Sequence, residues 1–119
     1  MDKMSEFICH LLHCVKVTHI LHLRTRSYAA HMALGAFYEE LDDLADGLAE
    51  SFQGKYGRLI EYEDMETNYS DSPLEYLISV SEYIQGTRPD LPQDSEIQNE
   101  IDTIQTLVNS TIYKLRFLS

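Results

Sequence analysis

Apolar residues recur at alternating steps of three and four along four segments of this chain. The clearest series lies between residues 34 and 52 and consists of Leu34, Phe37, Leu41, Leu44, Leu48 and Phe52. An α-helix turns about 100° per residue, so this spacing places the whole series on one face of a helix. The same pattern predicts helices over about residues 4–25, 28–53, 73–86 and 94–117.

The residue types at the ends of these segments agree with the predicted boundaries. Ser27 is a favourable N-cap for the second helix, and Gly54 and Gly57 are expected to end that helix. Pro73 suits the first position of the third helix because an amide hydrogen there would have no partner, and either residue of the pair 71–72 can cap it. Either residue of the pair 94–95 can cap the fourth helix.

The arrangement of these helices predicts the fold class. A chain of 119 residues suits a single domain, here residues 1–119. Four amphipathic helices, a short link between the first two and no convincing strand predict an all-α, ferritin-like four-helix bundle. Residues 55–72 are expected to form a crossover that packs through its tyrosines. The alternative architecture is two helical hairpins that complete their core only as a dimer.

The charge of the chain excludes some functions and favours others. Twenty acidic residues against nine basic ones give a net charge of −11. Phosphate binding needs clustered Lys and Arg, so direct nucleic-acid binding is not expected. The acidity suits a protein that attracts metal cations, binds a basic protein partner or mimics the DNA backbone.

The two cysteines and the first helix indicate the compartment. Cys9 and Cys14 are five residues apart, on different sides of the predicted helix, and are expected to be buried free thiols in the cytoplasm. Polar and charged residues interrupt the first helix long before the roughly 20 apolar residues that a membrane span requires, so no membrane association is expected.

The candidate functional residues are His19, His31, Asp46 and Glu50. On the second helix, His31, Asp46 and Glu50 flank the apolar stripe, beside small residues that allow another helix to approach closely. His31 and Asp46 are about 22 Å apart along the helix axis and cannot share one ion within one chain. Two antiparallel copies related by a two-fold axis would bring His31 of one chain to the carboxylates of the other. This predicts a homo-oligomer, at least a dimer, with intersubunit sites for iron, or alternatively for zinc or another divalent cation.

The stretch from His19 to Glu50 also resembles a known family, the Dps mini-ferritins. The resemblance rests on a His in the first helix, a second His twelve residues later, an Asp fifteen residues further on and a Glu four residues beyond that, within Asp46-Gly47-Leu48-Ala49-Glu50. It implies that His19 and His31 of one subunit, with Asp46 and Glu50 of its two-fold mate, bind iron and oxidise it as a ferroxidase.

Simpler interpretations of the same residues remain open. His31, Asp46 and Glu50 also fit a solvated helix face, and His22 fits a core-edge imidazole bonded to its neighbours. A small metal cluster of residues 10, 13 and 14 is a further alternative. The alternative function is a metal-free acidic interaction or structural protein, such as an assembly component or DNA mimic. The motifs of hydrolases and kinases do not occur in the sequence.

Overall fold

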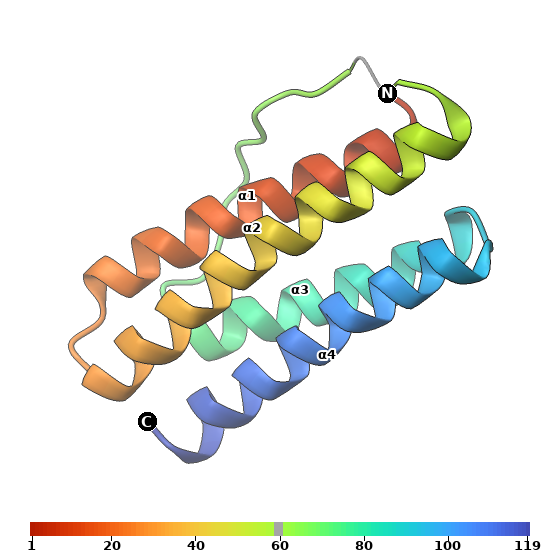
Figure 1. The fold of residues 1–119 in the computed structure, drawn as a ribbon. Helices are drawn as coiled ribbons and strands as arrows, with labels where there is room; N and C mark the ends of the chain where they lie inside the picture. Colours follow the sequence, from red (N-terminus) through yellow and green to blue (C-terminus); the bar gives the residue numbers. More distant parts are fainter. Residues whose placement is uncertain (59–60) are drawn as a thin grey trace.

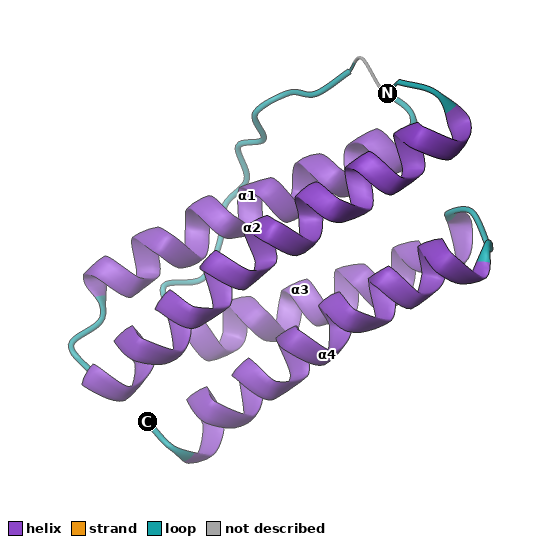
Figure 2. Cartoon of the chain, viewed as in Figure 1, coloured by secondary structure: helices purple, strands orange, loops and turns teal. Residues whose placement is uncertain are grey.

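The computed structural model describes residues 1–58 and 61–119, and its regular elements are four α-helices and one short 3-10 helix (Figures 1 and 2). The elements are α1 (Lys3–Arg24), α2 (Tyr28–Tyr56), α3 (Pro73–Thr87), η1 (Arg88–Asp90) and α4 (Ser95–Phe117). No strand occurs in these two described ranges. The predicted all-α four-helix fold is therefore confirmed.

The helices form two antiparallel hairpins joined by one long crossover (Figure 1). The crossover returns along α1, so that α2 and α3 run in the same direction. A single long crossover is the connectivity of ferritin-like bundles. Within the described ranges, no helix combines the length and apolar character that a bilayer crossing needs.

The crossover lies along α1 as an extended strap. The hydroxyl of Ser5, near the start of α1, donates to the backbone oxygen of Glu61, and Arg24 at the end of α1 forms an ion pair with Asp71 at 3.1 Å. Because extended chain advances more than twice as far per residue as a helix, some ten crossover residues match the length of α1. Tyr69 packs on the core as predicted, whereas Tyr62 is 41% exposed.

The core lies between the two hairpins and receives side chains from all four helices. Phe7, Phe37, Leu77 and Ile101 are among its fully buried members. Extensive contacts join α1 to α2, α2 to α4 and α3 to α4, whereas α1 and α3 contact each other much less. The α1–α3 seam is therefore the open side of the bundle, and the crossover lies over it.

The helix ends follow the predicted chemistry. The Ser27 hydroxyl accepts the Ala30 amide, and the Ser72 hydroxyl caps α3 ahead of Pro73. α2 continues to Tyr56, three residues past its predicted end, and stops at Gly57, whose φ of 100° strains any residue with a Cβ.

The end of α2 is also tied to the start of α4. Asp94 occupies the N-cap position of α4, but its side chain does not cap the helix. Its carboxylate instead accepts the Tyr56 hydroxyl at 2.6 Å and pairs with Lys55 at 2.6 Å. These contacts hold the two hairpins together at this end of the bundle.

Candidate functional site

The four predicted metal-binding residues lie in two separate groups. His19 and His31 lie near the α1–α2 turn, whereas Asp46 and Glu50 lie about four to five helical turns further along α2. His19, Asp46 and Glu50 are exposed and His31 is half-buried. The predicted iron site needs a second copy of the chain, so this arrangement leaves it a prediction.

The histidines near the turn form a stacked cluster. The rings of His22 and His31 stack with centroids 3.7 Å apart, and His19 stacks on Tyr38 at 4.2 Å. The Nδ1 atom of His22 lies 2.6 Å from the backbone oxygen of His31, and the Nδ1 atom of His31 lies 2.8 Å from the backbone oxygen of His22. When both Nδ1 atoms carry hydrogen, these reciprocal hydrogen bonds fasten α1 to α2.

Gly35 provides the space for this cluster. A Cβ at this position would lie 3.0 Å from the Cε1 atom of His22, closer than packed carbon atoms approach. The absence of a side chain on Gly35 therefore lets the His22 ring lie flat against α2. His22 is the core-edge imidazole that the sequence suggested, and its contacts are structural.

Asp46 and Glu50 border a shallow groove on the outside of the α1–α2 hairpin. Its volume is about 250 Å³, and its apolar part comes from Ile8, Leu12, Ala45 and Ala49. Leu12 is 42% exposed there. We call this feature the acidic groove.

The carboxylates of α2 extend beyond this groove. Glu39, Asp43, Asp46 and Glu50 follow one another at steps of four, three and four, so they lie on one face of α2. All four are exposed. The acidic groove is therefore part of a longer negative surface.

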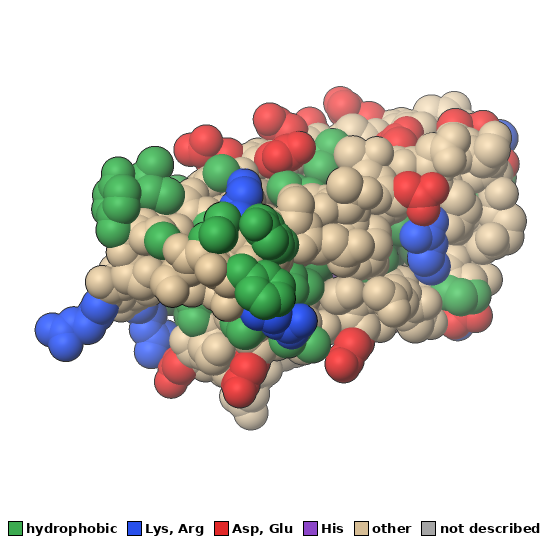
Figure 3. Space-filling model, turned by 90° about the horizontal axis from the view of Figure 1, so that it is seen from below, with side chains coloured by type: hydrophobic (Ala, Val, Ile, Leu, Met, Phe, Trp, Pro, Cys, Tyr) green, Lys and Arg blue, Asp and Glu red, His purple; other side chains and the backbone are tan. Residues whose placement is uncertain are grey.

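A basic surface lies where α1 ends, α2 begins and α4 ends. Residues 23–38 and 103–119 contain four basic residues and no acidic ones, while all 20 acidic residues lie elsewhere. Of the ten large hydrophobic side chains that are exposed in the described part of the chain, six lie in these stretches. Figure 3 shows hydrophobic and basic side chains gathered toward this end. This basic apolar end consists of Leu23, Arg24, Arg26, Tyr28, Met32, Tyr113, Lys114, Arg116, Phe117 and Leu118.

The basic apolar end is continuous between α2 and α4. A shallow hollow there is lined by Ala29, Met32 and Ala33 of α2 and by Lys114 and Leu118. Of the four cations only Arg24 forms an ion pair within the described ranges, with Asp71. The other three positive charges are available to a partner.

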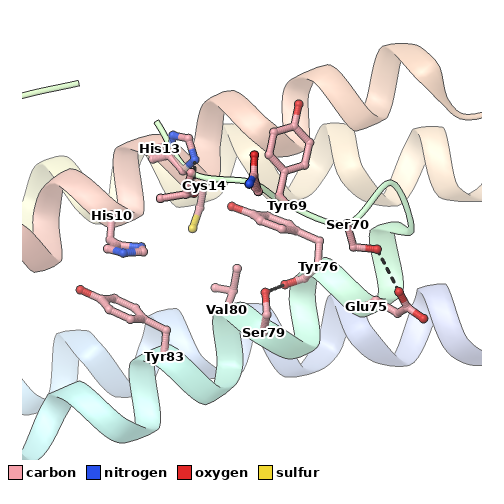
Figure 4. Close-up of a pocket in the computed structure, with 12 residues that line it drawn as sticks. His10, His13, Cys14, Tyr69, Ser70, Glu75, Tyr76, Ser79, Val80 and Tyr83 are labelled. Atoms are coloured by element: carbon pink, nitrogen blue, oxygen red, sulfur yellow. Dashed lines mark hydrogen bonds between the residues drawn. The ribbon is translucent and has the colours of Figure 1, made fainter. Parts of the chain in front are cut away.

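A third feature is a cavity of about 380 Å³ in the open seam between α1 and α3 (Figure 4). His10, His13 and Cys14 reach it from α1, Tyr76 and Tyr83 reach it from α3, and crossover residues 67–70 form its roof. We call it the crossover pocket. The three α1 residues were the alternative metal cluster, but within the described ranges no three His, Cys, Asp or Glu side chains come together to hold a metal ion.

The ionisable groups of the crossover pocket favour their uncharged forms. Burial lowers the pKa of His10 and of His13, because it disfavours the charged imidazolium. Burial also raises the pKa of the Cys14 thiol to about 11 and that of the Tyr83 phenol to about 12. The pocket therefore presents imidazole, thiol and phenol groups without their charges at neutral pH.

These imidazoles predict a loss of stability in mild acid. The unfolded chain binds protons near the ordinary histidine pKa of about 6.5, whereas folded His10 and His13 bind them only at lower pH. The free energy of unfolding should therefore fall as the pH decreases from about 7.5 to about 5.5, above the range where carboxylates titrate. Urea unfolding across this window measures the effect. The double variant His10→Gln/His13→Gln should show a smaller slope, and an unchanged slope would contradict the assignment.

The comparisons with known proteins point to a different family from the one that the sequence suggested. The family described as "Family of unknown function (DUF5856)" matches residues 22–115. The chain belongs to this family. It is also similar to a protein of Enterobacteria phage T4, printed as "Uncharacterized 14.6 kDa protein in mobD-ri intergenic region", with 35% identity over 57 residues. That match covers 48% of this chain and 44% of the phage protein, so the chain spans less than half of the relative's length. No solved structure matches the chain.

The predicted resemblance to the Dps family is wrong, because the family that matches is DUF5856. The physical reason is that His19, His31, Asp46 and Glu50 occur at spacings that any amphipathic helix pair can reproduce. In this fold His31 has a local partner in His22, and His19 has one in Tyr38. The matching interval is therefore one that helical periodicity alone can produce, and it does not establish membership of the Dps family.

Proposed function

We propose that this protein is a structural assembly component, in which the basic apolar end of one copy binds the acidic groove of the next. The observation that carries the proposal is the separation of charge: two stretches with four cations and no acid form one end, where only Arg24 has an acidic partner, and a row of carboxylates lies along α2. Opposite charges steer two such surfaces together and exclude like-charged arrangements.

Apolar anchors support the basic apolar end as the binding surface. Phe117 is 69% exposed and Tyr28 is 77% exposed, and aromatic residues beside arginine are typical of the residues that dominate protein interfaces. The acidic groove offers a complementary seat, since its apolar floor can receive a ring while Asp46 and Glu50 face the arginines. A phosphate backbone or a single basic partner would not use both surfaces.

The charge pattern also selects the geometry of assembly. Two basic apolar ends facing each other across a two-fold axis would repel, because each carries four positive charges. An end-to-groove contact joins different surfaces of the two copies and leaves one free surface on each side. Such heterologous contacts produce rings or open chains rather than closed two-fold dimers.

The direct test is the mass of the purified protein as concentration and salt are varied. Light scattering and sedimentation should show species larger than the monomer at low ionic strength, and rising salt should dissociate them because it screens the charges. Lys114→Glu/Arg116→Glu should weaken association by at least about tenfold. Lys3→Glu, a matched charge reversal on an exposed lysine at the other end of α1, should leave association close to wild type. A protein that stays monomeric at every concentration contradicts the proposal.

A charge exchange distinguishes the proposed end-to-groove contact from nonspecific self-association. Asp46→Lys/Glu50→Lys should also abolish self-association, because the groove then repels the cations of the end. Mixing this variant with Lys114→Glu/Arg116→Glu brings a wild-type end together with a wild-type groove, so the two variants should associate with each other although neither associates with itself. If the mixture stays monomeric while wild type assembles, the acidic groove is not the docking surface.

A further inference from the structure

The crossover pocket is a second site, on the α3 side of α1, and none of the residues of the assembly surfaces lines it. We propose that it binds an uncharged, planar heteroaromatic molecule of the nucleobase or nucleoside type. This inference is independent of self-assembly and rests on the shape, the ring faces and the charge of the pocket.

The size and position of the pocket are those of a small-molecule site. A volume of about 380 Å³ falls in the usual range for ligand pockets, which are commonly about 300–1,000 Å³. It lies where α1 and α3 make few contacts with each other, and the strap from Thr67 to Ser70 covers it. A ligand could therefore enter beside the strap without separating a packed pair of helices.

The walls of the pocket offer flat aromatic faces. His10 stacks on Tyr83 with ring centroids 3.8 Å apart and an angle of 22° between the ring planes. Tyr69 meets Tyr76 edge to face at 5.8 Å, and Figure 4 shows the Tyr76 phenol reaching toward Cys14. Aromatic walls favour planar aromatic ligands, because rings stack in offset or edge-to-face geometry.

The charges of the lining residues exclude anionic ligands. Among the described residues, no Lys or Arg lines the pocket, and Glu75 is the one lining carboxylate. A phosphate or carboxylate on the ligand would therefore meet no cation and would face a negative charge. Glu75 already accepts the Ser70 hydroxyl at 2.9 Å and has capacity to accept an amino group of a ligand as well.

The polar groups of the pocket include one with no partner. His13 is 5% exposed, and its Nδ1 atom makes no hydrogen bond with any described residue, while its Nε2 atom lies 3.1 Å from the Thr67 hydroxyl. Buried polar atoms in proteins are nearly always bonded, so His13 is a buried group that a ligand or water can satisfy from the crossover pocket or from the smaller hollow that it also lines beside Met65. Asn68 also lines the pocket and is exposed, and its carboxamide has both donor and acceptor groups that can pair with a base edge.

Titration of the protein with a panel of adenosine, cytidine, thymidine and nicotinamide tests the inference. The chain has no tryptophan, so no indole signals overlap the tyrosine ring resonances in NMR spectra. These tyrosine resonances therefore report on the pocket. At least one member of the panel should cause saturable shifts of the Tyr69, Tyr76 and Tyr83 rings. The corresponding nucleoside monophosphate should bind at least about tenfold more weakly, because it brings an anion into a site without cations.

A blocking variant and a matched control complete the test. Ser79 lines the pocket and is exposed, so Ser79→Trp should fold and fill the pocket, and it should abolish the shifts. Glu82→Trp adds the same side chain to an exposed position of α3 that does not line the pocket, and it should leave binding unchanged. The inference is overturned if no panel member binds saturably, if the monophosphate binds equally well, or if Ser79→Trp binds like wild type.

Discussion

Replacing Phe37 with alanine should lower the free energy of unfolding by about 3–5 kcal/mol. Phe37 lies in the first half of α2, is 0% exposed and belongs to the core that α2 shares with α1 and α4. The substitution removes the apolar surface of the ring and leaves a cavity that a close-packed core fills only in part. Domains of this size unfold with about 5–15 kcal/mol in total, so the loss is a large share of the stability.

Urea unfolding followed by far-UV circular dichroism measures this effect. Phe117→Ala is the matched control, because it removes the same side chain from a position that is 69% exposed, and it should change the stability by less than about 0.5 kcal/mol. Equal losses in the two variants would contradict the assignment of the core. The same Phe117→Ala protein should associate more weakly with itself, which separates the folding role of one phenylalanine from the binding role of the other.

Replacing Gly35 with leucine should separate α1 from α2 and destabilise the protein. A Cβ at Gly35 would already lie 3.0 Å from the His22 ring, and leucine adds three more carbon atoms in the same direction. Overpacking of this kind costs about 1–3 kcal/mol, and it also breaks the reciprocal hydrogen bonds between His22 and His31. The gain in helix propensity over glycine, about 0.8 kcal/mol, does not compensate for this loss.

Gly47 is the natural control for this substitution. It lies in the same helix, and a Cβ there meets no atom within 4 Å, so Gly47→Leu should stabilise the protein by up to about 0.8 kcal/mol. The two variants should therefore differ by roughly 2 kcal/mol or more in thermal or urea unfolding. Adding His22→Ala to Gly35→Leu should recover part of the lost stability, because it removes the imidazole ring that clashes with the leucine side chain. Equal stability of the two glycine variants would show that His22 moves aside freely.

The candidate sites were only partly predictable from the sequence. The basic apolar end has a sequence signature, because residues 23–38 and 103–119 carry four cations and no acid. Total charge alone conceals it, since the net value of −11 averages over both surfaces. The crossover pocket has no such signature: Tyr76 and Tyr83 become neighbours of His10 and Cys14 only when α3 is placed beside α1.

The predicted iron site has a sequence pattern, but that pattern does not by itself establish what its residues do. The spacing of His31, Asp46 and Glu50 was read as a ligand set, but spacing on a helix fixes only the direction of a side chain. The structure shows the neighbours of these side chains within one copy, a stacked His22 for His31 and an apolar groove for Asp46 and Glu50, and the intersubunit site stays a prediction. The proposed intersubunit iron site therefore lacks support from the family, and the mass measurements above will show whether copies meet at these residues at all.

The sequence by itself determined the helices, their caps and the face that each one buries. These properties depend on neighbours within one or two turns, as Ser27 capping α2 and Gly57 ending it demonstrate. Tertiary structure alone decided that the crossover runs along α1, that α1 and α3 leave an open seam, and that the start of α2 and the end of α4 meet as one surface. Such contacts join residues far apart in the chain, and helical periodicity carries no information about which helix will be the neighbour.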